Sequence, residues 1–331
     1  MKVFKNFGGM LTLICLLSCK PFPPRAHDYL LATASTGGTF YPVGVGLATL
    51  VTEVLQDSPA IRLSAMNSAG SGENVQLLSF READFAILQG LYGAMAMQGK
   101  GPYEGRPQQK AFQAICNLWF NVEHFVIDRD YQQRGDMSDL AELRGHRFSI
   151  GKRGSGTETS GRVILQALGY DVEQDFSLEF LGYGSSASAM QDGRLAGMNI
   201  PAGVPVAAIT QAFATMGADE LVVLDFDSLQ AARVNETFPL WQRYLIPPGT
   251  YPGQVDTIYT LAQPNFLAVH PSLPEEDVYR ITQAIFEHLP QLHQTHRAAQ
   301  QVGLETALQN LPCPLHPGAE RYFREKGLIV D

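Results

Sequence analysis

The chain has 331 residues, of which 45% are hydrophobic and 17% charged, with 33 acidic and 24 basic side chains for a net charge of −9. This apolar content excludes a mainly disordered chain. The acidic balance argues against a nucleic-acid partner, because neutralising phosphates requires clustered Lys and Arg. The length predicts two globular units.

The first residues have the pattern of an export signal. Lys2 and Lys5 precede a short apolar run over residues 10–17, so residues 1–18 are predicted to be a signal peptide. Residues 16–19 resemble the bacterial lipobox, which predicts lipidation of Cys19 and a periplasmic or outer-surface location; an ordinary signal peptide cut near Ala26 is the alternative. Loss of two lysines with the leader would shift the net charge from −9 to −11. No other stretch is apolar enough to span a membrane.

The remaining cysteines and the histidines predict no metal centre. Cys116 and Cys313 could form a disulfide in an oxidising compartment, or remain two buried thiols. The histidines are not joined to Cys or carboxylates at ligand spacing. We expect neither a metal nor a cofactor.

The first half of the mature chain alternates strands with helices. Strands are expected at 28–34, 61–66 and 83–88, with helices at 41–56 and after residue 74. Strand–turn–helix units in series are typical of a parallel sheet with helices on its faces.

The second half repeats this organisation. Strands are expected at 112–116, 124–127, 147–152, 177–181, 197–200, 221–225 and 259–269, with helices at 139–144, 159–168, 186–192, 206–214, 274–288 and 317–326. We expect two α/β lobes, with the chain crossing between them near 112–127 and 257–269. The first lobe comprises 28–118 plus 262–331, and the second comprises 119–261.

Three strand-to-helix turns share one chemistry. They are rich in Gly, Ser and Thr and lie at 36–39, 68–74 and 154–158. A helix N-terminus has unpaired N–H groups and partial positive charge, so such turns can bind a carboxylate without Lys or Arg. The alternative is that they are ordinary helix caps. In open α/β sheets these turns gather where ligands bind.

Motifs of common enzymes are incomplete. Neither Gly70-Ser71-Gly72 nor Gly154-Ser155-Gly156 has the leading glycine of a nucleophile elbow. Gly44-Val45-Gly46 lacks the third glycine of a dinucleotide fingerprint, and no Walker lysine follows a glycine turn. We therefore do not expect an enzyme.

Six collinear motifs resemble one family of receptors. They are TGGTFYP at 36–42, GSGEN at 70–74, ADFAILQ at 83–89, GSGTE at 154–158, YPGQ at 251–254 and PLHPGA at 314–319. With the export signal, they make the chain similar to the TAXI-type solute-binding proteins, the extracytoplasmic receptors of a subgroup of TRAP transporters.

The resemblance implies a type II periplasmic-binding-protein fold, in which two α/β lobes joined by crossing strands close on a small ligand. It implies capture of glutamate, 2-oxoglutarate or a related carboxylate, which is passed to a TRAP membrane permease. It also implies a monomeric receptor. The ligand-binding residues carried over from the motifs are Thr36, Gly38, Thr39, Tyr41, Ser68, Ser71, Asn74, Gln89, Ser155, Gly156, Thr157, Gly203 and Val204.

Departures from the family pattern affect the ligand. Phe40 replaces the first of two tyrosines, and Gly90 follows Gln89 where an acidic residue is common. These changes favour a carboxylate that needs no strong ammonium partner. Two other roles stay open: a sensor that signals to a membrane histidine kinase, and a secreted enzyme with a Ser or His nucleophile.

Overall fold

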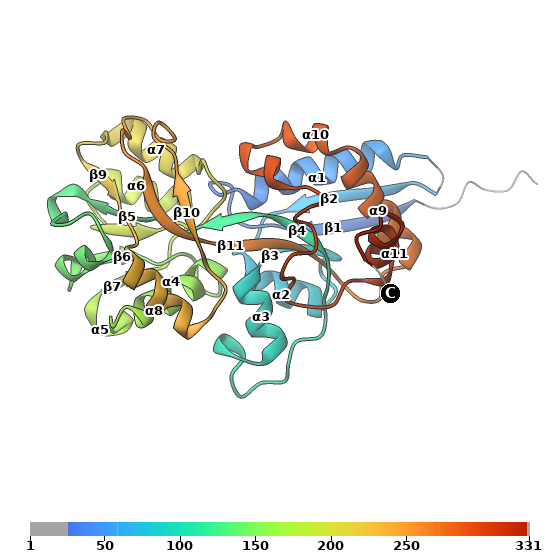
Figure 1. Ribbon diagram of the computed structural model, residues 1–331, viewed down its shortest axis with the longest axis horizontal. Coiled ribbons are helices and arrows are strands. Elements are labelled where there is room, and N and C mark those ends of the chain that lie inside the picture. The colour runs from blue at the N-terminus through green and yellow to red at the C-terminus, as the bar shows by residue number, and fades with distance from the viewer. Residues whose placement is uncertain (1–25, 58, 330–331) are drawn as a thin grey trace, which may run out of the picture.

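The computed structural model describes residues 26–57 and 59–329, which form two α/β lobes side by side (Figure 1). Each lobe has its own sheet, and helices cover both sheets. The predicted signal peptide and Cys19 lie outside the described residues. Within the part of the chain described, no helix is long and apolar enough to cross a membrane.

A six-stranded sheet forms the first lobe and continues toward the second lobe through β4 (Gln113–Val122), β10 (Gln242–Ile246) and β11 (Ile258–Val269). Its other strands are β1 (His27–Ala32), β2 (Ile61–Met66) and β3 (Phe85–Gln89). The order is β10-β11-β3-β1-β2, and β4 pairs with β11. β1 is parallel to β2 and β3, whereas β11 is antiparallel to each of its partners.

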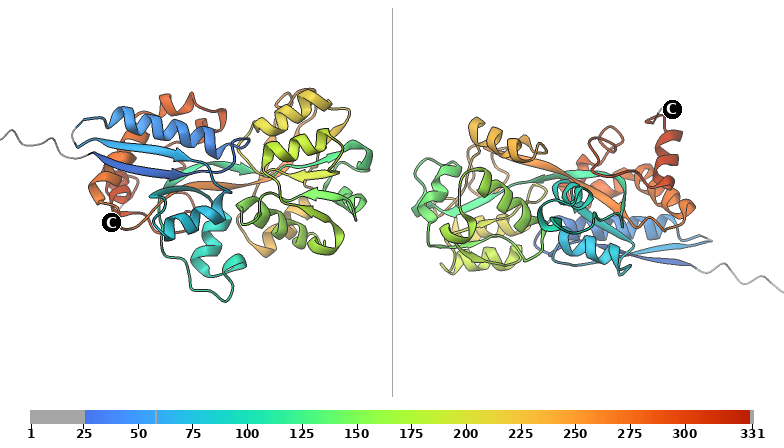
Figure 2. Two further views of the ribbon diagram at one scale, coloured as in Figure 1. Left: turned by 180° about the vertical axis from the view of Figure 1, so that it is seen from behind. Right: turned by 90° about the horizontal axis from the view of Figure 1, so that it is seen from below.

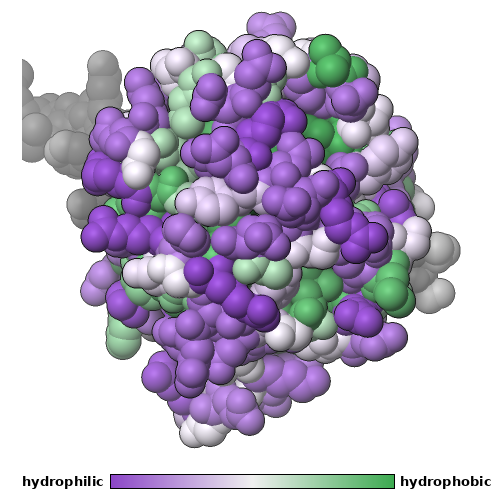
Figure 3. Space-filling view, turned by 90° about the vertical axis from the view of Figure 1, so that its left-hand side faces the viewer, coloured by the Kyte–Doolittle hydropathy of each residue, from purple (hydrophilic) through white to green (hydrophobic). Residues whose placement is uncertain are grey.

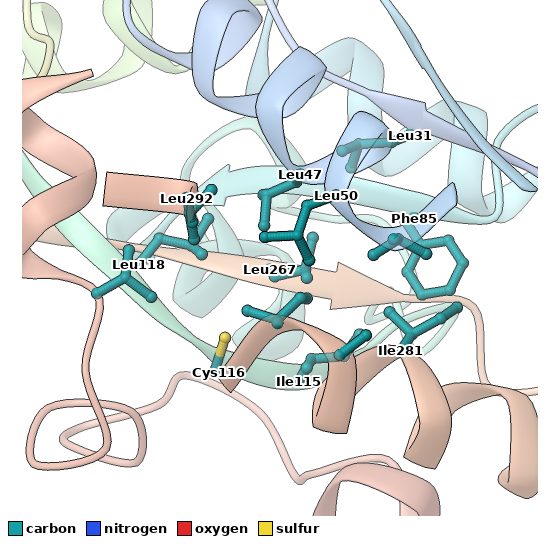
Figure 4. Close-up of a cluster of buried hydrophobic side chains, with 14 of the residues drawn as sticks. Leu31, Leu47, Leu50, Phe85, Ile115, Cys116, Leu118, Leu267, Ile281 and Leu292 are labelled. Carbon is teal, nitrogen blue, oxygen red and sulfur yellow. The ribbon is translucent and has the colours of Figure 1, made fainter. Parts of the chain in front are cut away.

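Helices cover both faces of this sheet (Figure 2). They are α1 (Phe40–Val54), α2 (Ser71–Ser79), α3 (Gly90–Gln98), α9 (Glu275–Glu287), α10 (Leu289–His293) and α11 (Pro317–Glu325). One face packs against α1 and α9–α11, where Leu47, Phe85 and Ile281 belong to one buried cluster (Figure 4). The other face packs against α2 and α3.

The second lobe contains a five-stranded sheet with the order β7-β6-β8-β5-β9. Its strands are β5 (Phe125–Asp128), β6 (Arg147–Ser149), β7 (Ser177–Glu179), β8 (Gly197–Asn199) and β9 (Leu221–Val223). Its helices are α4 (Gly156–Ala167), α5 (Val172–Asp175), α6 (Tyr183–Gln191), α7 (Ala207–Met216) and α8 (Ser228–Thr237). The outer end of this lobe is mainly hydrophilic, with scattered apolar patches (Figure 3).

The long strands β4 and β11 run side by side from one lobe toward the other (Figure 1). Each is buried along most of its length. Shifts in their register at Pro264/Phe266 and Leu267/Ala268 mark irregular pairing. Because both strands belong to the same ladder, a hinge movement of the lobes would bend the chain at or near this pair.

Several elements differ from the sequence predictions. The predicted strand 112–116 extends to residue 122, and the predicted helix 139–144 is a 3-10 helix over Met137–Leu143. The pattern missed α3, α5, α8, α10 and β10. α8 and β10 each expose a large apolar residue, Leu229 and Leu245, which obscures the alternation of buried apolar and exposed polar positions.

The two body cysteines are free thiols, so the disulfide alternative is wrong for this structure. Cys116 and Cys313 belong to different buried clusters. Burial raises the pKa of both thiols, which keeps them protonated and unreactive. Among the described residues, no group of three or more potential ligands could hold a metal ion.

Candidate functional site

A small cavity of about 30 Å³ lies between the two lobes. Its lining comes from both of them: Ala34, Ser35, Gly38, Thr39, Phe40, Ala69, Gly70, Ser71 and Gln89, then Asn121 on β4, and Lys152, Ser155, Gly156, Thr157, Leu181, Gly182, Tyr183, Pro201 and Ala202. A water molecule needs roughly 10–15 Å³ of such space. The cavity as it stands therefore holds a few water molecules.

Four helices begin at this cavity. The first turns of α1 and α2 reach it from one lobe, at Phe40 and Ser71, and those of α4 and α6 reach it from the other, at Gly156 and Tyr183. Each N-terminus contributes unpaired N–H groups and about half a positive charge. Their convergence favours an anion in the cavity, and Glu73 and Glu158 in the first turns of α2 and α4 offset part of this charge.

Lys152 adds the only formally charged side chain of the lining. It is partly buried, and no carboxylate lines the cavity. The sequence predicts turns that can bind a carboxylate without a basic side chain, and the structure places such a side chain beside them. Tyr183 stays neutral, because burial raises its pKa, and its hydroxyl donates to Pro201 O at 2.6 Å.

The serine hydroxyls at two helix starts are oriented by backbone groups. Ser71 Oγ accepts from Gln89 N at 3.0 Å, and Ser155 Oγ accepts from Glu158 N at 3.1 Å, which makes Ser155 the N-cap of α4. Each hydroxyl keeps its own proton for donation. Both are buried, so a ligand oxygen in the cavity is a natural acceptor.

Two buried amides at the cavity lack partners. Gln89 is 3% exposed and its Oε1 has no hydrogen bond; Asn121 is fully buried and both of its side-chain polar atoms are unpartnered. An unsatisfied buried polar atom costs about 1–3 kcal/mol, so such groups usually have a function. Their position suits them to hydrogen-bond a ligand.

The lobes are in close contact around the cavity. Thr39 Oγ1 donates to Gly203 O at 2.8 Å, which links the start of α1 to the loop after β8. A methyl carbon placed on Gly72 would lie 1.8 Å from Gly154 O, and one on Gly156 would lie 2.2 Å from Gln89 Oε1. Only glycine permits the backbone at Gly72 to approach Gly154 O, and the backbone at Gly156 to approach the Gln89 side chain, this closely.

Seven of the residues predicted from the sequence line the cavity: Gly38, Thr39, Ser71, Gln89, Ser155, Gly156 and Thr157. Ser68 and Asn74 do not, because they are bonded within the fold. Asn74 Nδ2 donates to Thr33 O at 2.7 Å and to Ile87 O at 2.9 Å, while its Oδ1 accepts from Ser68 Oγ at 2.7 Å.

The four other predicted residues also lie outside the lining. Thr36 is exposed and Tyr41 is partly buried. Gly203 packs against Trp119 and contributes its carbonyl to Thr39. Val204 belongs to a buried cluster of the second lobe and precedes a cis proline.

The sequence analysis missed Lys152, Tyr183, Asn121 and Ser35 as site residues. Lys152 ends the predicted strand directly before the 154–158 turn, so its position was a usable signal. The sequence gives no signal for Asn121, because it lies within the buried strand β4. Only the path of β4 between the lobes brings this side chain to the cavity.

Comparisons with known proteins identify the fold. Solved structures with the same fold include the periplasmic binding protein BugD, 13% identical, with a TM-score of 0.54 over 93% of this chain and 95% of that one. MatC from Rhodopseudomonas palustris with bound malate is 15% identical, with a TM-score of 0.53 over 92% and 98%. PhnD1 from Prochlorococcus marinus in complex with methylphosphonate is 12% identical, with a TM-score of 0.52 over 91% and 99%.

These likenesses confirm the predicted periplasmic-binding-protein fold of two α/β lobes. A family model described as the NMT1-like family matches residues 31–327, nearly all of the described chain. The chain therefore belongs to the NMT1-like family.

Proposed function

We propose that this protein is an exported solute receptor of the TAXI type. It captures a small organic anion between its lobes and delivers it to a TRAP membrane permease for uptake. The observation that carries this proposal is the convergence of four helix N-termini and Lys152 on a cavity with no carboxylate in its lining.

The electrostatics of the cavity favour an anion. Charges near a helix N-terminus are each stabilised by about 0.3–1 kcal/mol at exposed sites and by up to ~2 kcal/mol when partly buried. Two starts face the cavity from each lobe, so a ligand with two acidic groups can engage both lobes at once. The protein's net charge of −9 would repel such a ligand at long range, and the local positive potential must overcome this.

The same lining argues against an amino-acid ligand as the best fit. An ammonium group would need a carboxylate or several carbonyl acceptors, and it would be repelled by Lys152. Among glutamate, 2-oxoglutarate and related carboxylates, we therefore expect the dicarboxylates without an amine to bind most tightly. MatC, which has a similar fold, was solved with malate bound.

Binding requires movement of the lobes. A cavity of about 30 Å³ cannot admit a dicarboxylate, so the cleft must open about β4 and β11 and close again over the ligand. Closure is favoured because hydrogen bonds from both lobes form only when the cleft is shut. The closed form would be the one that the permease recognises.

A calorimetric screen tests the ligand. We expect malate and 2-oxoglutarate to bind with a stoichiometry of one. Glutamate should bind at least about 10-fold more weakly, a difference of about 1.4 kcal/mol, because its ammonium group has no carboxylate partner in the lining of the cavity. Tight binding of glutamate with no binding of 2-oxoglutarate would refute the proposed selectivity. Native mass spectrometry of freshly purified protein provides an independent identification of any copurified ligand.

Export and lipid anchoring are tested separately from binding. The full-length protein should acquire a lipid at Cys19 in a bacterial host, and Cys19→Ala should be released from the membrane fraction without a change in ligand affinity. Transport is tested by uptake of the labelled ligand with and without the permease. Uptake that needs the receptor but no permease would contradict the proposed pathway.

A further inference from the structure

A second cavity, of about 410 Å³, lies beside the strands that connect the lobes. Its walls are residues 117–120 of β4, 264–265 of β11, 239–242 before and within β10, and parts of the C-terminal segment 301–310. A volume of several hundred cubic ångströms is typical of pockets for small molecules. None of the sequence motifs falls in this cavity.

The cavity lies on the other face of the connecting strands from the cleft. Asn121 of β4 lines the cleft, and it is paired with Gln263 of β11. Their chain neighbours Phe120 and Pro264 line the second cavity, and these two are also paired with each other. Since successive strand residues point to opposite faces, the two sites share the same pair of strands back to back.

The lining is uncharged and combines apolar side chains with amides. Trp119, Phe120, Leu240 and Pro264 contribute apolar surface, and the polar members are amides and one threonine. No ionisable side chain is among them, in contrast to the cleft with Lys152. An ion would lose its hydration here without a compensating charge.

Two buried amides in the lining point to a ligand: Asn265 is fully buried with both side-chain polar atoms unpartnered, and Asn117 has one unpartnered atom. Asn117 is 6% exposed and its Oδ1 has no hydrogen-bond partner. Its Nδ2 is already committed, since it donates to Thr306 O at 3.3 Å and to Gln309 O. Asn117 Oδ1 is therefore a free acceptor, which a ligand with an N–H or O–H donor could satisfy.

We propose that this cavity is a second binding site, which takes a small uncharged molecule with a planar apolar body and an amide-like donor. The apolar body lies against the Phe120 and Pro264 surfaces, and the donor reaches Asn117 Oδ1. The class of ligand is distinct from the anion proposed for the cleft.

The position of the site links it to lobe movement. Leu240 packs against a core cluster of the second lobe, whereas the segment around Val302 and Ala307 belongs to the main cluster of the first lobe. Bending of the strands between them changes the distance between these walls. A ligand that fits only one spacing favours one degree of opening and thereby changes the affinity of the cleft, with equal effect in the reverse direction.

Nuclear magnetic resonance with two matched probes tests the site. Benzamide is uncharged, and benzoate has nearly the same shape but a negative charge. We expect benzamide to shift the backbone amide signals of residues 117–120 and 265 with a Kd of about 1 mM, which is ordinary for so small a ligand. Benzoate should bind there at least about 10-fold more weakly.

A variant at the mouth of the cavity provides the structural control. Gln242 is exposed and lines the cavity, so Gln242→Trp should block benzamide and weaken it by at least about 10-fold. Gln211→Trp places the same side chain at an exposed position on α7, outside this lining, and should leave binding unchanged. Equal melting temperatures of the two variants show that both fold.

Two results would overturn the proposal. One is the absence of shifts at residues 117–120 with benzamide at several times its expected Kd. The other is benzoate binding to this cavity with the same affinity as benzamide. This comparison uses the wild-type protein alone. Coupling is measured as a change of about 3-fold or more in malate affinity at saturating benzamide. An unchanged malate affinity would overturn the coupling, whereas failure of malate to bind at all would count against the cleft ligand alone.

Discussion

The close approach of Gly72 and Gly154 makes cleft closure sensitive to a single methyl group. Gly72 lies in the first turn of α2, with helical geometry that alanine adopts readily. Its added methyl carbon would lie 1.8 Å from Gly154 O, whereas ordinary contact begins at 3.4 Å, so the backbones must separate by about 1.6 Å. Gly72→Ala should therefore hold the cleft partly open.

The expected cost falls mainly on binding, because the shortest clash is with Gly154 O of the other lobe. Overpacking of this kind costs about 1–3 kcal/mol, so the affinity for malate should fall by roughly 10- to 100-fold in calorimetry. The free energy of unfolding should change little, since alanine is favoured over glycine in a helix by up to about 1 kcal/mol and this offsets the cost of shifting Tyr92 Oη, which the methyl would approach to 2.6 Å. The matched control is Gly184→Ala in the first turn of α6, where an added methyl meets nothing within 4 Å. Malate affinity of Gly72→Ala equal to that of Gly184→Ala would refute the reasoning.

Three further variants separate binding from stability. Lys152→Met should weaken malate by about 10-fold and reduce the dependence of its affinity on salt, measured by calorimetry; an unchanged affinity would remove Lys152 from the site. Asn74→Ala should leave malate affinity nearly intact but lower the free energy of unfolding by about 2–4 kcal/mol in urea, because three buried hydrogen bonds are lost.

Burial raises the pKa of Glu123 to about 7, so wild-type stability should fall as pH rises from about 5 to 8, where the unfolded state binds fewer protons than the folded one. Glu123→Gln should remove this loss, which amounts to about 2 kcal/mol between the two pH values. Urea titrations at pH 5 and pH 8 measure it. If the stability of both proteins depends on pH in the same way, Glu123 is not the group responsible. Burial lowers the pKa of the neighbouring His124 to about 4, so its contribution to the free energy of unfolding rises with pH up to about 6.5. This contribution is present in both the wild type and the variant, so it cancels in the comparison.

The sequence predicted the local parts of the site well. Ser71 and Ser155 could be placed because a hydroxyl at a helix start, directly after a strand, is a pattern within a few residues. The alternation of strands and helices then placed these turns at the same edge of each sheet. Every residue in this group is positioned by its own turn.

The remainder depended on contacts distant in the chain. Asn74 looks like a ligand residue in the sequence, but its partners Thr33 O and Ile87 O come from two other strands and occupy it fully. Asn121 looks like an interior strand residue, yet the course of β4 between the lobes brings it to the cavity. Caps and ligand-binding residues use the same side chains, so only the packed structure separates them.

The acidic composition excluded nucleic acid as a partner but could not locate the positive potential of the cleft. That potential arises from the backbone at four helix starts and from Lys152. A count of charged residues does not include helix dipoles. It also does not show which lysine lies in the cleft.

Recognition of negative charge in the cleft is the central claim, and calorimetry with malate and malamide tests it most directly. The two molecules have nearly the same shape, but malamide carries neutral amides in place of both carboxylates. We expect malate to bind with a stoichiometry of one and malamide to bind at least about 100-fold more weakly, a difference of about 2.7 kcal/mol. Equal affinity for the two molecules, or binding of malamide alone, would contradict the account.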